Sequence, residues 1–180
     1  MRKTAAFVLA FGALALLLPT GCTRMTPQEV KASIEITDIE TKWVSKLYQQ
    51  WPARLILVPQ LSFRVKNLSA KPMTYVNFNA IFKFKGDREE LGTNFLAAIR
   101  GKAVPPGGTS DLIILTSNFG VDGKDLKTIQ TSPGWKQAEV ELFAQSHGTM
   151  PILLGTFDVS RFIDFKEDAP VEPKKAEVKK

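Results

Sequence analysis

Few residues of this sequence could carry acid–base or nucleophilic chemistry. The chain has one histidine, His147, and one cysteine, Cys22. His147 stands in the turn-forming run SHGT at 146–149, where an imidazole is usually solvated, and no G-x-S-x-G sequence supplies an activated serine. This count also excludes an intrachain disulfide and any zinc site built from several thiolates or imidazoles. We therefore expect a protein that is not an enzyme, and an enzyme using His147 as its base is kept as an alternative hypothesis.

The acidic residues that could serve as catalytic or metal-binding groups form two clusters. They are Asp87/Glu89/Glu90 and Asp122/Asp125. The first lies in a charged turn and the second at the start of a short helix, where turns and helix N-caps normally use carboxylates. A calcium site from Asn118, Asp122 and Asp125 would lack the EF-hand spacing. No Walker or dinucleotide fingerprint occurs either, so the sequence predicts no metal and no cofactor.

The basic charge of the chain does not predict nucleic-acid binding. The sequence has 24 Lys plus Arg against 18 Asp plus Glu, and its formal net charge is +6. The positive residues are scattered, and those near the C-terminus alternate with Glu. Loose attraction to anionic lipid or cell-wall polymer fits this pattern, and so does a solvated surface that keeps the protein soluble.

The first 22 residues have the layout of an export signal. Arg2 and Lys3 form a positive start, residues 5–18 are apolar without a charge, and Thr20 and Gly21 are small residues before Cys22. The apolar run is shorter than the roughly 20 residues that a membrane-spanning helix needs. We therefore predict a cleavable signal peptide over residues 1–21.

At these residues the leader resembles the signal of bacterial lipoproteins, although Pro19 stands where that family has Leu and Leu18 lies one position further out. The resemblance implies cleavage between Gly21 and Cys22, a diacylglycerol on the Cys22 sulfur and an acylated new N-terminus. Two or more acyl chains give lasting membrane attachment. Thr23 is not the Asp that commonly retains Gram-negative lipoproteins at the inner membrane, which favours the outer membrane, facing the periplasm. Secretion after an ordinary cleavage, or an uncleaved anchor, remain the alternatives.

The mature chain reads as one domain between two polar ends. Residues 22–32 are predicted to be a tether, residues 33–165 a folded domain, and residues 166–180 a disordered charged tail. Residues 75–84 alternate between apolar and polar side chains and are typical of a half-buried strand. Residues 61–65 alternate in the same way, and the NLSAKPMT connection between the two predicts a hairpin.

Further strands are predicted along the rest of the domain. Candidates are residues 32–43, 53–58, 91–99, 138–144 and 150–165, together with 110–116, which we expect to be covered on both faces. Residues 121–130 form the single helical candidate. Seven or eight short strands with one short helix predict an all-β fold, an antiparallel β-sandwich.

Residues 62–93, SFRVKNLSAKPMTYVNFNAIFKFKGDREELGT, resemble the immunoglobulin-like modules of bacterial envelope lipoproteins, including the FxLyD type. In those modules a strand ends in Asn-x-Ser, and a long alternating strand follows and leads to Gly. A Phe-x-Leu-x-Asp segment near the C-terminus is missing here, where Phe157-Asp158-Val159 stands instead. The resemblance implies an immunoglobulin-like sandwich.

Three aromatic residues lie close together in the sequence and form a possible interaction surface. Trp43, Tyr48 and Trp51 could be an exposed platform, or they could pack over the open end of the sandwich. Trp135 is predicted to be in the core. We expect a non-catalytic, lipid-anchored envelope protein that displays an edge or loop surface to an unidentified envelope protein or polymer. The alternative is a carrier that holds a lipid or other apolar ligand between its sheets.

Overall fold

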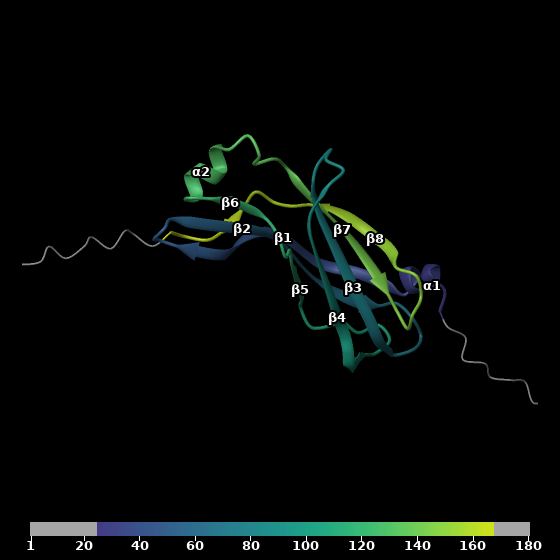
Figure 1. The fold of residues 1–180 in the computed structure, drawn as a ribbon. Helices are drawn as coiled ribbons and strands as arrows, with labels where there is room; N and C mark the ends of the chain where they lie inside the picture. Colours follow the sequence, from purple (N-terminus) through teal and green to yellow (C-terminus); the bar gives the residue numbers. More distant parts are fainter. Residues whose placement is uncertain (1–24, 168–180) are drawn as a thin grey trace, which may run out of the picture.

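The computed structural model describes residues 25–167, which form an all-β sandwich of two sheets (Figure 1). The predicted cleavage site, Cys22 and most of the predicted tail lie outside these residues. One sheet has the order β5-β2-β1-β9, with β6 also paired to β2, and the other has the order β4-β3-β7-β8. This arrangement confirms the predicted all-β sandwich, with nine strands and two short helices in the described part of the chain where the sequence predicts seven or eight strands and one helix.

The first sheet is built on a long hairpin. β1 (Ile34–Gln49) and β2 (Arg54–Asn67) are antiparallel, and β5 (Ile113–Thr116) and β6 (Val121–Gly123) follow one another along the free side of β2. β9 (Ile163–Asp164) pairs in parallel with β1. The outer part of this hairpin extends beyond the sandwich, where α2 (Leu126–Thr131) and β6 accompany it (Figure 1).

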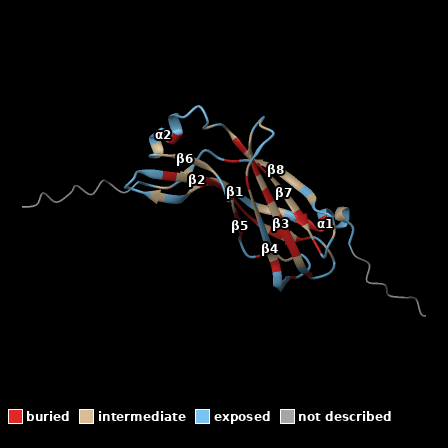
Figure 2. Cartoon of the chain, in the orientation of Figure 1, coloured by how far each residue is buried: buried red, intermediate tan, exposed pale blue. Residues whose placement is uncertain are grey.

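The second sheet contains the predicted strand of residues 75–84. It consists of β3 (Met73–Phe84), β4 (Glu90–Val104), β7 (Ala138–Gln145) and β8 (Ile152–Asp158), all antiparallel. The alternation in β3 is confirmed: Val76, Phe78, Ala80 and Phe82 are buried. Figure 2 shows buried segments, in red, along β3. Apolar side chains from both sheets therefore meet in one core.

Phe63 of β2 and Phe78 of β3 show how the sheets fill the space between them. Both side chains are fully buried, and their rings meet edge to face with centroids 5.2 Å apart. The alternating residues of β7, from Ala138 to Ala144, face the same core. The core of this sandwich rests on apolar burial, as the absence of a cysteine pair in the sequence requires.

The connection from β2 to β3 crosses between the sheets, so the predicted hairpin is wrong. β2 pairs with β1, β5 and β6, whereas β3 pairs with β4 and β7. The reason lies at Asn67, whose buried amide donates to the carbonyls of Lys71 (2.8 Å) and Val104 (2.9 Å). Its Oδ1 accepts from the backbone N–H of Ser69 at 2.9 Å. These bonds shape the loop as a sheet-to-sheet connector.

Strand β5 is covered on one face only, which corrects the expectation for residues 110–116. Ile113 and Leu115 point into the core and are buried, whereas Leu112 and Ile114 remain 49% and 47% exposed. β5 ends its sheet, and nothing in residues 25–167 packs over the outward face of these two side chains enough to bury them.

Several other boundaries differ from the prediction. The stretches at 53–58 and 61–65 belong to one strand, β2, because pairing with β1 continues through Pro59. Residues 121–130 hold both β6 and the start of α2. The predicted last strand, residues 150–165, is divided into β8 and β9. Between them the chain crosses from the second sheet to the first.

The fold begins before residue 33, so residues 27–32 do not belong to the tether predicted over 22–32. Helix α1 (Pro27–Ala32) starts with a capping box in which the Thr26 hydroxyl accepts from the N–H of Glu29 and the Glu29 carboxylate accepts from that of Thr26. Val30 is 1% exposed and belongs to the core. Within residues 25–167, no helix is long and apolar enough to span a bilayer.

Candidate functional site

The strands β4 and β5 bring the edges of the two sheets together on one side of the sandwich. Each strand ends its sheet. Their neighbouring ends are tied by Asn118, whose side-chain oxygen accepts from the N–H of Thr93 at 2.8 Å and whose N–H donates to the Thr93 carbonyl at 3.2 Å. Asn94 adds a side-chain bond to the carbonyl of Thr116 at 2.6 Å. This end of the edge is therefore closed.

Gly92 makes this closure sterically possible. A Cβ at residue 92 would lie 2.3 Å from Oγ of Ser117 and 2.8 Å from Oδ1 of Asn118. Both distances are too short for carbon against oxygen, so a larger residue would push these side chains away. The glycine in the sequence LGT thus lets the turn after β5 approach β4.

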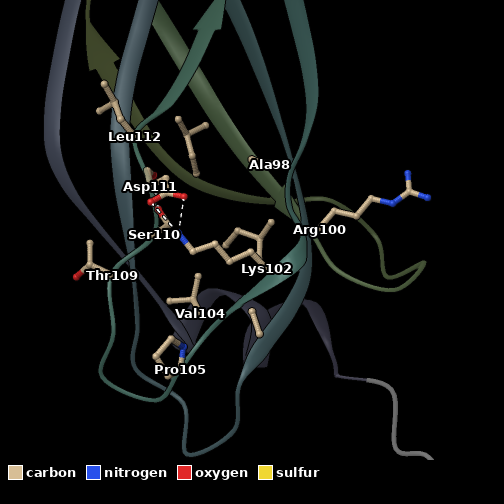
Figure 3. Close-up of a pocket in the computed structure, with 12 residues that line it drawn as sticks. Ala98, Arg100, Lys102, Val104, Pro105, Thr109, Ser110, Asp111 and Leu112 are labelled. Carbon is tan, nitrogen blue, oxygen red and sulfur yellow. Dashed lines mark hydrogen bonds and ion pairs between the residues drawn. The ribbon is translucent and has the colours of Figure 1, made fainter.

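Beyond this closed end the two strands separate and leave a cleft of about 140 Å³ (Figure 3). Residues 98–105 line one side, and residues 109–113 line the other. Across it Lys102 of β4 forms an ion pair with Asp111 at 2.9 Å, and both side chains are largely exposed. Figure 3 shows Arg100 pointing away from this pair. The edge is therefore bridged by one solvated ion pair, which binding of another chain could displace at little cost.

The pKa of Asp111 lies below its ordinary value. The hydrogen bond from Lys102 is the largest cause, the positive charge of Lys102 adds to it, and Arg64 contributes a smaller attraction. The carboxylate of Asp111 is thus negative at neutral pH. Arg64 is held nearby by donating to the carbonyl of Ser110 at 2.9 Å.

Large apolar side chains remain exposed along the same edge. They are Phe95 and Leu96 of β4, Leu112 and Ile114 at β5, and Phe119 just after β5. Leu96 lies opposite the core residue Phe78 in the β3–β4 ladder. Its side chain is therefore on the face of the sheet that points toward the core of the sandwich, yet it stays 38% exposed. A sheet edge with apolar side chains is a template for strand addition by another chain.

The sequence could not have assigned this edge as the site. In the strand predicted over 91–99, Phe95 and Ile99 share one face by simple alternation, and the structure buries Ile99 but exposes Phe95. The pairing of β3 with β4 shifts register between the Phe78–Leu96 and Val76–Ile99 pairs, which reverses the face on either side of the irregularity. A strand bulge leaves no clear signal in a single sequence.

The three aromatic residues predicted as a possible surface do not form a common one. Trp43 is 1% exposed and its ring centroid lies 4.5 Å from that of Trp135. Tyr48 is half-buried and packs edge to face on Phe165, at 5.1 Å between centroids. Trp51 stands at the tip of the hairpin and is 89% exposed. An exposed platform of all three is therefore wrong, and the core placement predicted for Trp135 holds because this residue packs against the core.

The histidine does not contact a catalytic partner in the part of the chain that the structure describes. His147 is exposed in the β7–β8 turn, with a positive φ of 42°, and its ring lies 5.1 Å from that of Tyr75. A positive φ is uncommon outside glycine, but histidine is among the residues that adopt it more often, and Gly148, which follows in the turn, also has a positive φ. The predicted turn position of His147 is confirmed.

The side chains considered for metal binding each contact a different partner in the protein. Asp122 pairs with Arg54 at 2.6 Å, and Asp125 caps α2 by accepting from the N–H of Thr128 at 2.6 Å. Asn118 is bound to Thr93. Asp87 of the other cluster pairs with Lys136 at 3.0 Å. Within residues 25–167, no group of three His, Cys, Asp or Glu side chains is arranged to hold a metal ion.

Comparison with known proteins adds no family. No protein-family model matches the chain. A search of the curated proteins also finds no match. Among solved structures, the chain is similar to the crystal structure of a Bordetella pertussis protein given the name ApaA, with 12% sequence identity and a TM-score of 0.39. The match covers 71% of this chain and 93% of that one. A similarity at this level carries no argument about what this chain does.

Proposed function

We propose that this protein is a non-catalytic, lipid-anchored protein of the cell envelope that binds an extended segment of another envelope protein. Its anchor is Cys22, acylated after cleavage behind Gly21, as the leader sequence indicates. In a Gram-negative cell the outer membrane, facing the periplasm, is the favoured location. Its partners are then the membrane, through the anchor, and an envelope protein or polymer, and nucleic acid is not among them.

The observation that carries the binding role is the exposed edge of β4 and β5. Both strands end their sheets, and the cleft between them is bridged by a solvated ion pair. Leu112, which lines the cleft, is exposed, and so are Phe95 of β4 and Ile114 of β5 outside the cleft. A segment in extended conformation can form main-chain hydrogen bonds with such an edge and bury these side chains. The apolar character of the edge favours a protein segment over a hydrated polymer.

The packing between the sheets supports an interaction module over a carrier. A carrier would need apolar space between its sheets. Here Phe63 and Phe78 meet directly in that position, and Leu61, Val65 and Leu142 pack around them in the same core.

The anchor is tested by the intact mass of detergent-extracted protein expressed in its native host. We expect the mass of residues 22–180 plus a diacylglycerol and a further acyl chain, and no lipid on the Cys22→Ala protein. An unmodified mass in the soluble fraction would contradict the anchor. A full-length mass in the membrane would mean that the leader is retained.

The binding edge is tested by photo-crosslinking in the same cells. A photoreactive residue at Ile114 is compared with one at Leu153 on β8, an exposed aliphatic side chain on the strand that ends the second sheet at its other side. We expect a discrete adduct only from Ile114, and its loss when Leu112→Lys is added. Equal adducts from both positions, or an adduct insensitive to Leu112→Lys, would contradict binding at this edge.

A further inference from the structure

The end of the domain that carries α1 exposes apolar side chains from three separate segments. Met25 precedes α1, Leu68 lies in the β2–β3 loop, and Met150 lies between β7 and β8. The loop is fixed to the helix end by a hydrogen bond from the N–H of Leu68 to the carbonyl of Ser33 at 2.9 Å. α1 also contacts β7 and β8, and Figure 1 shows it beside the β7–β8 turn.

Two lysines accompany these apolar side chains. Lys31 of α1 and Lys71 of the β2–β3 loop are both exposed, and neither forms an ion pair with any of residues 25–167. The nearby carboxylate of Glu29 accepts the backbone N–H of Thr26 in the capping box of α1 and remains negatively charged. Together the two lysines and this carboxylate carry a net charge of +1 beside the apolar side chains.

A groove lies between α1 and the β2–β3 loop. It has a volume of about 540 Å³, and its lining includes the charged side chains of Lys71 and Glu29. Met25, Ala32, Ala70, Pro72 and Met73 contribute to this lining. The combination of methionine, proline and lysine at a surface is suited to the interface of a bilayer, where apolar parts enter the headgroup region and lysines reach lipid phosphates.

The position of Cys22 in the sequence sets how far this end can stand from a membrane. Residues 23–26 separate Cys22 from Pro27, the first residue of α1, so that the two Cα atoms can be at most about 17 Å apart in a fully extended chain. By contrast, β1 starts after α1 and its 16 residues extend up to about 50 Å away from it. The anchor therefore holds the α1 end close to the lipid and leaves the hairpin tip distant.

We propose that this end, defined by Met25, Lys31, Leu68, Lys71 and Met150, docks on an anionic bilayer surface. The inference rests on the proposed lipid anchor and adds an orientation to it. The domain stands with α1 on the headgroups and with the Trp51 tip projecting from the membrane. Lys31 and Lys71 contact lipid phosphates, and the three apolar side chains enter the interface.

The test uses the lipidated full-length protein in vesicles of phosphatidylethanolamine and phosphatidylglycerol. Cys22 is the only cysteine and is blocked by lipid, so a single introduced cysteine can be labelled with a fluorophore. We compare Met150→Cys, where the side chain is 75% exposed, with Trp51→Cys at the hairpin tip, where it is 89% exposed. Nitroxide-labelled headgroups are expected to quench the probe at residue 150 and to leave the probe at residue 51 unquenched.

The outcomes separate the docking from the anchor. If the intact mass shows lipidated protein and both probes remain equally unquenched, the docking is overturned and the anchor stands. If the mass shows no lipid and Cys22 reacts with maleimide, the anchor is overturned and the docking with it. Quenching at residue 150 alone supports both.

A charge reversal tests the role of the lysines. Lys31→Glu with Lys71→Glu is expected to lower the ratio of docked to undocked protein by at least about fivefold at each position, since one lysine near an anionic surface contributes about 1 kcal/mol and the introduced carboxylate adds repulsion. Lys124→Glu with Lys127→Glu makes the same change beside α2, at the other end of the domain, and should leave the quenching unchanged. Equal effects of the two pairs would overturn docking through Lys31 and Lys71.

Discussion

Trp43 of β1 and Trp135 of the segment before β7 pack ring against ring, with centroids 4.5 Å apart and planes inclined by 49°. They lie where the long β1–β2 hairpin leaves the sandwich. In the sheet, Trp43 lies opposite Pro59 of β2 on one side of β1 and opposite Ile163 of β9 on the other side. The contact thus joins four distant parts of the sequence and extends the core toward the hairpin.

The two tryptophans of the hairpin are predicted to differ strongly in their contribution to stability. Trp43→Ala should lower the free energy of unfolding by about 3–5 kcal/mol, because it leaves a cavity in a packed core. Trp51→Ala should change it by less than about 0.5 kcal/mol, because this side chain is almost fully exposed. Urea denaturation of the Cys22→Ala protein, followed by circular dichroism, measures both. Similar losses for the two variants would contradict the assignment of Trp43 to the core.

Asp125 is predicted to stabilise α2 in a way that depends on pH. Its pKa is lowered, first by the hydrogen bond from the backbone N–H of Thr128 and then by the Thr128 side chain. A lowered pKa in the folded state means that the stabilisation is present above the ordinary value of 3.8 and is lost as the pH falls through the folded-state value. Asp125→Ala should therefore lower the urea midpoint at pH 7.

The matched control is Asp125→Asn, which keeps a side-chain oxygen for the cap but carries no charge. We expect this variant to be more stable than Asp125→Ala at pH 7. As the pH falls below 4, the wild-type protein should lose stability relative to Asp125→Asn. A constant difference between these two proteins across the acid range would show that the carboxylate does not act through its charge.

Much of the fold followed from alternation, and the exceptions have local causes. The inward residues of β3 and β7 could be predicted because both strands lie inside the second sheet, with one face on the core. The apolar run at β5 was misleading, since an end strand can expose Leu112 and Ile114 that a central strand would bury. The β2–β3 crossover was missed because Asn and Pro also occur in hairpin turns, and the partners of Asn67 lie as far along the chain as Val104.

The candidate site was less predictable than the fold. The sequence drew attention to Trp43, Tyr48 and Trp51 because they are close together in the chain, but alternation of side chains and the hairpin turn separate them in space. The edge of β4 and β5 instead joins residues that no sequence motif relates, and it depends on a register shift in β4. The leader sequence led to the envelope hypothesis, whereas identifying the surface required the pairing of the strands.

The ion pair across the cleft is predicted to control the titration of Asp111. Lys102→Gln removes both the hydrogen bond and the charge that lower its pKa, so this pKa should rise toward 3.8. NMR titration of the Asp111 carboxyl measures the change. Lys136→Gln, which breaks another exposed ion pair, with Asp87, serves as the control and should leave the pKa of Asp111 unchanged. An unchanged Asp111 titration in Lys102→Gln would mean that the pair does not persist in solution.

The buried amide of Asn67 is predicted to hold the crossover between the sheets. Asn67→Ala should lower the free energy of unfolding by about 1–3 kcal/mol, because the buried carbonyl of Val104 loses the Asn67 amide as a donor. The carbonyl of Lys71 also loses this donor but can still accept from the Ser69 hydroxyl at 2.8 Å. Asn67→Asp should destabilise more at neutral pH, because a carboxylate would face these two carbonyl oxygens in a fully buried position.

The pH dependence of Asn67→Asp distinguishes this mechanism from simple loss of packing. Burial and the two carbonyls should raise the pKa of the introduced carboxyl, so its protonated form, which can donate, predominates at lower pH. The stability deficit of Asn67→Asp relative to wild type should therefore shrink as the pH falls from 7 to 4. Asn79→Asp, at a half-buried position on the outer face of β3, should show a much smaller deficit. If the deficits of the two variants were equal at every pH, the side-chain bonds of Asn67 would not be what fixes the β2–β3 connection.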